Sequence, residues 1–354
     1  MTVFAACSSS PPPCKPFDLT IPATSPGANV VWTGNEYLLL VAGRSPITAQ
    51  SPTDNVIQVV TSDGQMGSVF ATVPLSEGTI WDLARSLAWS GSTLGTLVET
   101  MTPAPAMLQL LRFDGDGKEL GTTTLTEAAI QYPQLVWADD RFVASWLSMN
   151  NSQLNIVEIS SDGSASAPIV ITQGTGFIFN TLRDFAASSK RYVAVVSDSY
   201  LAPTFVLVDR ASHDTSMVMP VQDAFAVSTR NDEIAFATGL GTATIFQDVD
   251  TSDQQTTAVQ EPLGATTAAM VPTASGFGIY GLGVQDPSTM MCNVEFLDVD
   301  ASGTARGASS TVATFPCEGS FVGPNPVTRD NGYAANVAYG PGPFATQRLI
   351  QQCK

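Results

Sequence analysis

Residues 135–142, Leu-Val-Trp-Ala-Asp-Asp-Arg-Phe, form an apolar run, a short polar turn and an aromatic residue that opens a second apolar run. Residues 30–37, Val-Val-Trp-Thr-Gly-Asn-Glu-Tyr, and residues 87–94, Leu-Ala-Trp-Ser-Gly-Ser-Thr-Leu, repeat this arrangement. Four weaker copies follow, and they end at Tyr192, Ile234, Phe277 and Tyr333. Two apolar runs joined by a tight polar turn are typical of a β-hairpin, so we expect seven copies of one hairpin.

The residue that opens the second run recurs at near-regular spacing. Its seven positions are Tyr37, Leu94, Phe142, Tyr192, Ile234, Phe277 and Tyr333. Successive positions are 57, 48, 50, 42, 43 and 56 residues apart, about 49 on average. Repeats of about 40–50 residues without helical periodicity are typical of β-propeller blades, each a four-stranded antiparallel sheet.

Each repeat then continues with two further short runs joined by a turn. In the first repeat, residues 56–60 lead through Asp63 and Gly64 into residues 69–73, and the second and third repeats turn at residues 114–117 and 162–163. β-Branched runs bounded by Asp-Gly turns again predict hairpins. The sequence therefore predicts an all-β, seven-bladed propeller with four antiparallel strands in each blade.

The two ends of the chain are expected to close the ring together. Residues 347–351 form a third strand with no fourth strand after it, and residues 17–21 precede the first blade without a blade of their own. If these segments pair, they complete the seventh blade and remove the open sheet edges.

Five cysteines accompany this closure. Cys14 and Cys353 fall where the other blades have a turn, and Cys292 and Cys317 lie at opposite ends of the sixth outer hairpin. We predict Cys14–Cys353 and Cys292–Cys317 disulfides, each contributing about 2–4 kcal/mol. Cys7 is then the one cysteine without a partner. Two disulfides and one remaining cysteine favour an exported protein.

The beginning of the chain bears on location. Residues 4–7, Phe-Ala-Ala-Cys, precede three serines and three prolines and resemble the end of a bacterial lipoprotein signal peptide. The resemblance implies lipidation of Cys7, with residues 1–14 as signal remnant and tether and residues 15–354 as a single propeller domain. Only six residues precede Cys7, without a basic n-region or full apolar h-region, which points to a misplaced start codon or a shortened chain. No other apolar run reaches the ~18 residues needed to span a bilayer, so the membrane is expected to be contacted only through the lipid.

The hairpin repeats resemble those of exported bacterial propeller proteins, many of them predicted lipoproteins, whose blades carry Trp-x-Gly-x-x-Tyr turns. The resemblance covers residues 15–353 and is clear in three of the seven repeats. It implies a propeller fold and a location at the bacterial outer membrane, the cell surface or the periplasm, and it brings no catalytic residue with it.

Composition excludes several functions. Fifteen Lys plus Arg against 32 Asp plus Glu leave a formal net charge of −17, which argues against nucleic-acid binding because that needs a basic surface. His213 is the single histidine, so no site can use two imidazoles. It falls in the fourth outer turn, which favours a surface turn over a Ser/His/Asp triad.

Asp-rich turns superficially resemble calcium-binding loops. They contain Asp114 and Asp116, then Asp248, Asp250 and Asp253, then Asp298 and Asp300. None fits a hand-type loop, and aspartate favours tight turns because its side chain bonds the local backbone. We therefore expect no cofactor, and calcium binding is the alternative.

Propellers generally bind ligands on the face formed by the loops between blades and between the second and third strands, so we take candidates from there by analogy. The candidate ligand-binding residues are Trp81, Asp82, Tyr132, Arg183, Asp198, Tyr200 and Asp286. Aromatic residues flanked by carboxylates suit a sugar, and two carboxylates about 5–9 Å apart could hydrolyse a glycoside. The favoured interpretation is that the aromatic residues pack between blades and the carboxylates solvate the rim.

Three functions compete. The leading hypothesis is a monomeric, non-enzymatic, lipid-tethered binding or scaffold propeller of the cell envelope, with an envelope protein or glycan as its partner. The alternative is a carbohydrate-active hydrolase or lyase that uses Asp82, Asp198 or Asp286. The third hypothesis is a calcium-stabilised adhesion module.

Overall fold

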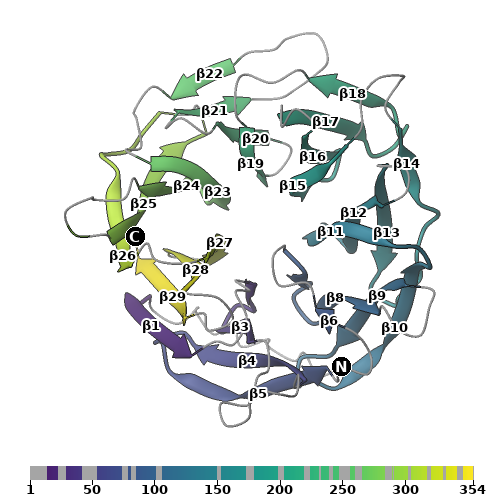
Figure 1. Cartoon of the computed structure of the whole chain (residues 1–354), viewed down its shortest axis with the longest axis horizontal. Helices are drawn as coiled ribbons and strands as arrows, with labels where there is room; N and C mark the ends of the chain where they lie inside the picture. The colour runs from purple at the N-terminus through teal and green to yellow at the C-terminus, as the bar shows by residue number, and fades with distance from the viewer. Residues whose placement is uncertain are drawn as a thin grey trace, which may run out of the picture.

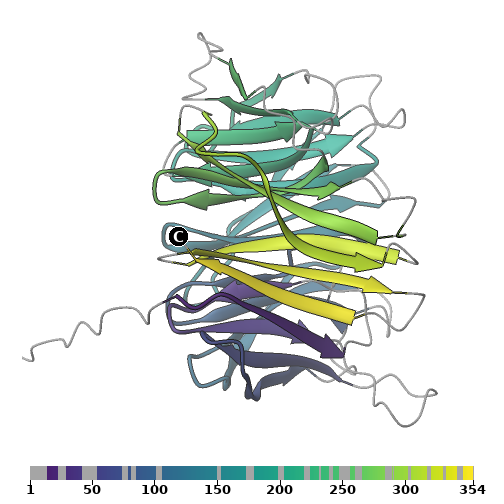
Figure 2. The ribbon, with the colours of Figure 1, turned by 90° about the vertical axis from the view of Figure 1, so that its left-hand side faces the viewer.

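The computed structural model describes residues 14–22, 29–41, 54–73, 79–80, 85–100, 106–149, 153–172, 179–197, 203–218, 224–230, 233–238, 242–246, 256–259, 265–283, 289, 291–301, 304–316, 320–329, 332–340 and 346–353. Within these ranges the strands form seven antiparallel sheets that stand around a common axis as the blades of an all-β propeller (Figure 1). Figure 2 shows the ring from the side, with strands of neighbouring blades stacked above one another.

Six of these sheets have four strands, and blade 2 has five because β6 and β7 both pair with β8. From the axis outward, blades 1 to 7 consist of β2 (Val30–Trp32), β3 (Glu36–Val41), β4 (Asn55–Thr61) and β5 (Met66–Val73); β6 (Thr79–Ile80) with β7 (Leu87–Trp89), β8 (Leu94–Thr100), β9 (Met107–Phe113) and β10 (Glu119–Thr126); β11 (Ile130–Ala138), β12 (Arg141–Ser148), β13 (Leu154–Ser160) and β14 (Ile169–Ile171); β15 (Thr181–Ala187), β16 (Arg191–Ser197), β17 (Pro203–Asp209) and β18 (Thr215–Val218); β19 (Ala224–Arg230), β20 (Glu233–Thr238), β21 (Thr242–Phe246) and β22 (Thr256–Val259); β23 (Ala265–Thr273), β24 (Gly276–Gly283), β25 (Met291–Asp300) and β26 (Ser310–Pro316); and β27 (Ser320–Arg329), β28 (Gly332–Gly340), β29 (Thr346–Cys353) and β1 (Phe17–Pro22).

The recurrent position identified in the sequence occupies the same place in every blade. It lies at or near the start of the second strand and pairs with the inner strand just before the turn, as Tyr37 does with Trp32 and Phe142 with Trp137. All seven residues at this position are buried, with at most 4% of their surface exposed. The periodicity therefore reports a core position between blades, which confirms the repeat assignment.

The ring closes as expected. β1 pairs antiparallel with β29, from Phe17 opposite Gln351 to Pro22 opposite Thr346. A Cys14–Cys353 disulfide joins the two strands, with Cα atoms 5.6 Å apart, so this predicted bond is confirmed. Cys292 is also disulfide-bonded. Its expected partner Cys317 lies outside the described residues, as does Cys7.

One position on each third strand determines how the blade meets the next one. Within its own blade, the residue at this position pairs with the second-strand residue that comes directly after the recurrent residue. In the neighbouring blade, it is matched with that blade's recurrent residue. The seven correspondences are Val59 with Leu94, Arg112 with Phe142, Glu158 with Tyr192, Leu207 with Ile234, Ile245 with Phe277, Asp298 with Tyr333 and Gln351 with Tyr37. Each of the three tyrosines corresponds to a residue with a side-chain acceptor, whereas Leu94, Ile234 and Phe277 correspond to aliphatic residues. At the seams of Tyr37 and Tyr192 the matching supplies the acceptor that a buried phenol needs.

The contacts at two seams bear this out. The Tyr192 hydroxyl donates to Glu158 Oε1, and the Tyr37 hydroxyl donates to Gln351 Oε1. Burial raises the pKa of Tyr37 to about 12, although Arg329 opposes the shift. Arg112 also bridges a seam, because its Nη1 donates to the carbonyl of Ser161 in blade 3 at 2.6 Å.

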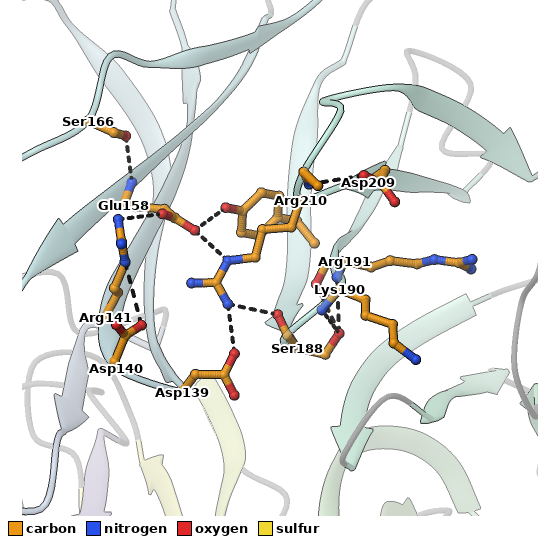
Figure 3. Close-up of polar contacts among 12 residues, drawn as sticks. Asp139, Asp140, Arg141, Glu158, Ser166, Ser188, Lys190, Arg191, Asp209 and Arg210 are labelled. Atoms are coloured by element: carbon orange, nitrogen blue, oxygen red, sulfur yellow. Dashed lines mark hydrogen bonds and ion pairs between the residues drawn. The ribbon is translucent and has the colours of Figure 1, made fainter.

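The seam between blades 3 and 4 carries an ion-pair network around Glu158 (Figure 3). Its Oε1 also accepts from Arg210 Nε at 2.5 Å, and its Oε2 accepts from Arg141 Nη1 at 3.1 Å. Arg210 Nη1 further donates to Asp139 Oδ2 at 2.8 Å. Burial tends to raise the pKa of Glu158, but hydrogen bonds from Tyr192 and Arg210 outweigh it and lower that pKa.

Candidate functional site

The inner strands share an irregularity at one level of the ring. A β-bulge interrupts β11, β15, β19, β23 and β27, whereas in blade 2 residues 81–84, between β6 and β7, lie outside the described residues. A bulge redirects the side chains next to it, so this is where an inner strand can present polar groups to the axis. In each blade, one residue lies three positions before the inner-strand residue that pairs with the recurrent residue. In blades 1 to 7 these residues are Asn29, Ser86, Gln134, Asp184, Ala226, Ala269 and Asn325.

These positions tie the first five blades together. The amide of Ser86 donates to Asn29 Oδ1 at 2.8 Å, which joins blades 1 and 2. Gln134 Nε2 donates to the carbonyl of Leu182 at 3.4 Å, which joins blades 3 and 4. Blades 2 and 3 are joined one residue earlier, where the carbonyl of Arg85 accepts from a backbone amide at 2.6 Å.

Asp184 is the acidic member of this belt and is only 5% exposed. Its Oδ1 accepts from the amide of Phe185 and its Oδ2 from the amide of Val227 in blade 5, both at 2.9 Å. Burial raises the pKa of Asp184, while Arg85 and the two amides oppose that shift. Each carboxylate oxygen is therefore already engaged by the backbone.

Arg85 lies just before β7 in blade 2, and its side chain reaches across the axis. Its Nη1 lies 3.5 Å from Asp184 Oδ1 in blade 4, and its Nη2 donates to the carbonyl of Met270 in blade 6 at 3.4 Å. Arg85 and its two partners belong to blades 2, 4 and 6, which are not neighbours in the ring (Figure 1). The guanidinium thus connects blades that share no seam.

A cavity of about 340 Å³ lies on the axis, and residues from all seven blades line it. Its lining consists of the last few residues of the inner strands, so it opens toward the turns between first and second strands. At the final position of this run, blades 1 to 3 have Trp32, Trp89 and Trp137, whereas blades 4 to 7 have Ala187, Thr229, Pro272 and Thr328. Three indoles therefore form one wall, and small side chains leave the space opposite.

Arg85 is the charged residue among the described residues that line the cavity. A guanidinium has five N–H donors. The two that contact Asp184 and Met270 do so at 3.4 Å or more, so donor capacity remains. Trp89 also lines the cavity, but its Nε1 is fully buried, so a ligand in the cavity cannot reach that N–H group. Arg85 is therefore the charged donor that the described cavity offers.

Two of the candidate residues from the sequence lie in the described regions. Tyr132 sits in the bulge of β11 with a φ of 52° and is 37% exposed, so its side chain is more accessible than the packed position that we expected. Arg183 sits in the bulge of β15, next to Asp184, and is half-buried. Trp81, Asp82, Asp198, Tyr200 and Asp286 lie outside the described residues.

Sequence reasoning missed Arg85 and Asp184. The available signal was their spacing: Asp184 lies three residues before the end of its inner run, where the other repeats have uncharged residues, and Arg85 lies four before, where only the fourth repeat also has a charge, at Arg183. A charge at that depth in an otherwise apolar inner strand needs a partner.

The Asp-rich outer turns bond their own backbone. Asp114 Oδ1 accepts from the amides of Asp116 and Lys118 at 3.0 and 2.9 Å, and Asp300 Oδ1 accepts from Thr304 at 2.9 Å. Across the described ranges, no three His, Cys, Asp or Glu residues gather as metal ligands would. Residues 248–253 lie outside those ranges.

His213 is exposed in the turn between β17 and β18, at the rim of the ring, with a φ of 62° (Figure 1). The expected surface turn is confirmed. In the parts of the chain that the structure describes, no helix is long and apolar enough to cross a membrane.

Comparisons with known proteins agree on the fold. No protein-family model and no curated protein matches the chain. Among solved structures, a proposed 6-phosphogluconolactonase from Bacteroides fragilis is 14% identical, with a TM-score of 0.51, covering 86% of this chain and 90% of that one. A second, from Bacteroides uniformis, is 15% identical, with a TM-score of 0.50 and coverage of 87% and 93%. The protein U3-55K is 9% identical, with a TM-score of 0.57 and coverage of 94% and 98%. At such identities the likeness shows the β-propeller fold alone.

Proposed function

We propose that this protein is an exported, non-enzymatic binding propeller of seven blades whose ligand occupies the central cavity. The observation that carries the proposal is the cavity itself, which all seven blades line. Its volume lies in the range of small-molecule sites, and its walls belong to paired strands rather than loops. A preformed cavity favours binding because no ordering has to accompany ligand entry.

The charged groups at the cavity support binding rather than turnover. Both oxygens of Asp184 accept backbone N–H groups, and the carboxylate faces Arg85. A general base or nucleophile must be directed at the substrate, whereas Asp184 is not among the described residues that line the cavity. The hydrolase hypothesis rests on Asp82, Asp198 and Asp286, which lie outside the described residues.

Disulfide bonding supports export. Cys14 and Cys353 are bonded to each other, and Cys292 is bonded as well. Disulfides persist in the periplasm and at cell surfaces and are rare in the cytosol. We place the protein in the bacterial envelope, held by a lipid on Cys7.

The tether is tested at Cys7. Cys7→Ser, in the full chain expressed behind an intact export signal, is expected to lose metabolic labelling by a palmitate analogue and to move from the membrane to the soluble fraction. The melting temperature should not change, because the residue precedes the propeller. Labelling that persists in Cys7→Ser would show that the lipid, if any, is attached elsewhere.

The binding function is tested by recovering the ligand. Purified protein is incubated with small-molecule and glycan extracts of bacterial envelopes, washed, and analysed by native mass spectrometry. We expect a bound compound that is released unchanged and that is absent from Ala187→Trp, which places a fourth indole in the open half of the cavity. Release of a converted product, or equal recovery from Ala187→Trp, contradicts a non-enzymatic binding site at the cavity.

A further inference from the structure

The cavity has one flat wall that is held in place. Trp32 packs against Tyr37 with ring centroids 4.6 Å apart, and Trp137 packs against Phe142 at 4.8 Å. The guanidinium of Arg329 lies 4.6 Å from the Trp32 ring centroid and supports it from another side. Indoles fixed in this way present a rigid surface to a planar apolar group.

The polar groups at the cavity are complementary to an acceptor. Its lining within the described residues includes no aspartate or glutamate, while the Arg85 side chain is 24% exposed and has donor capacity left. The hydroxyls of Thr229 and Thr328 already donate to carbonyls of blades 4 and 6. A ligand that supplies one oxyanion would satisfy the arginine, and a charged hydrogen bond of this kind is strong.

The charge of the protein limits how negative the ligand can be. The net charge is −17. A negative overall charge opposes the approach of anions, and a single guanidinium faces the described cavity. A molecule with one negative charge and an apolar body fits these conditions better than a phosphate or a polyanion.

We propose that the central cavity binds a small planar apolar molecule bearing one carboxylate, with the carboxylate at Arg85 and the apolar body against the indole wall. This inference rests on the proposed binding function and names the ligand class of the same cavity. An indole wall with a single arginine at its inner end orients such a ligand with its charged end inward.

The probe for this proposal is 1-naphthoate, with 1-naphthamide as the neutral molecule of the same shape. Isothermal titration calorimetry on the full chain is expected to show one site, with quenching of tryptophan fluorescence on binding. The naphthamide should bind at least 10-fold more weakly, because it cannot supply an anion to Arg85. Equal affinity for the two compounds, or no binding of naphthoate, overturns the proposal.

Three variants locate the site without touching Arg85, whose loss could affect folding through Asp184. Ala187→Trp should abolish naphthoate binding, and Trp89→Phe should weaken it several-fold while retaining the bulk of the wall. The matched control is Val170→Trp, which adds an indole on the outer strand β14, where Val170 is 50% exposed, and should bind as wild type does. Unchanged binding by a folded Ala187→Trp places the probe elsewhere and overturns the assignment.

A competition experiment separates the two proposals. If an envelope compound binds wild type, is lost in Ala187→Trp and is not displaced by 1-naphthoate, the cavity is a binding site and the ligand class is wrong. If the compound is displaced by naphthoate, both stand. If naphthoate binds only outside the cavity and no envelope compound is recovered, both fail.

Discussion

Asp184→Ala is expected to lower the free energy of unfolding by about 3–5 kcal/mol. The substitution removes the acceptor of two backbone N–H groups, from Phe185 and from Val227 in the next blade, both at 2.9 Å. It also removes the carboxylate that Arg85 faces across the axis at 3.5 Å. Each buried donor left without an acceptor costs about 1–3 kcal/mol, and the Arg85 guanidinium, whose side chain is 24% exposed, loses its ion-pair partner.

Chemical denaturation followed by circular dichroism measures this effect. Asp184→Asn retains one acceptor oxygen and should fall between alanine and wild type. Asp140→Ala is the matched control, because that side chain is 75% exposed and its variant should differ from wild type by less than about 0.5 kcal/mol. A loss below about 1 kcal/mol for Asp184→Ala would mean that the belt around the axis does not hold the blades together.

Glu158→Ala is expected to lower the free energy of unfolding by about 3 kcal/mol, the second largest effect. Glu158 accepts from Tyr192, Arg210 and Arg141 at the seam of blades 3 and 4 (Figure 3). The side chains of Glu158 and Arg210 are 15% and 13% exposed, so water replaces these bonds only in part. The phenol of Tyr192 is left without its acceptor.

A compensating variant tests the matching of residues across the seams. Glu158→Leu combined with Tyr192→Ile reproduces the Leu207 and Ile234 correspondence at the seam of blades 4 and 5. The double variant should be more stable than Glu158→Leu alone, and a double-mutant cycle measures the coupling. If the two substitutions add without coupling, the seam correspondence has no energetic meaning.

The same network predicts a pH dependence. Hydrogen bonds from Tyr192 and Arg210 outweigh burial and lower the pKa of Glu158 from its ordinary value of 4.5. A carboxyl with a lowered folded-state pKa stabilises the protein above its ordinary pKa, and that contribution is lost as the pH falls toward the folded-state value. The stability difference between wild type and Glu158→Gln should therefore be full at pH 7 and shrink below pH 4.5. A difference that grows on acidification would contradict this sign.

The fold could be read from local patterns because a propeller repeats one unit. The aromatic or aliphatic residue after each turn must be buried wherever that unit packs on its neighbour, so its spacing counts the blades. Tyr37, Phe142 and Tyr333 accordingly lie in the same register position of their blades. Closure by residues 17–21 was predictable too. The last blade lacks a fourth strand and the first segment has no blade of its own, and pairing the two leaves no open sheet edge.

The cavity could not be read in the same way. Arg85 and Met270 are 185 residues apart and meet only because the ring brings blades 2 and 6 to one axis. The analogy pointed to the loops between blades, where most of the candidate residues lie outside the described residues, and it did not lead to the described cavity at the other ends of the inner strands. Which end of an inner strand has room depends on the side chains of all seven blades at once.

The sequence by itself determined the blade count, the closure of the ring and the Cys14–Cys353 bond, because each follows from short-range pattern or from the need to satisfy strand edges. The tertiary structure alone decided that Arg85 and Asp184 face each other and that three tryptophans share a wall. The physical reason is that bulges shift the register of individual inner strands, and ring geometry then sets which redirected side chains meet across the axis.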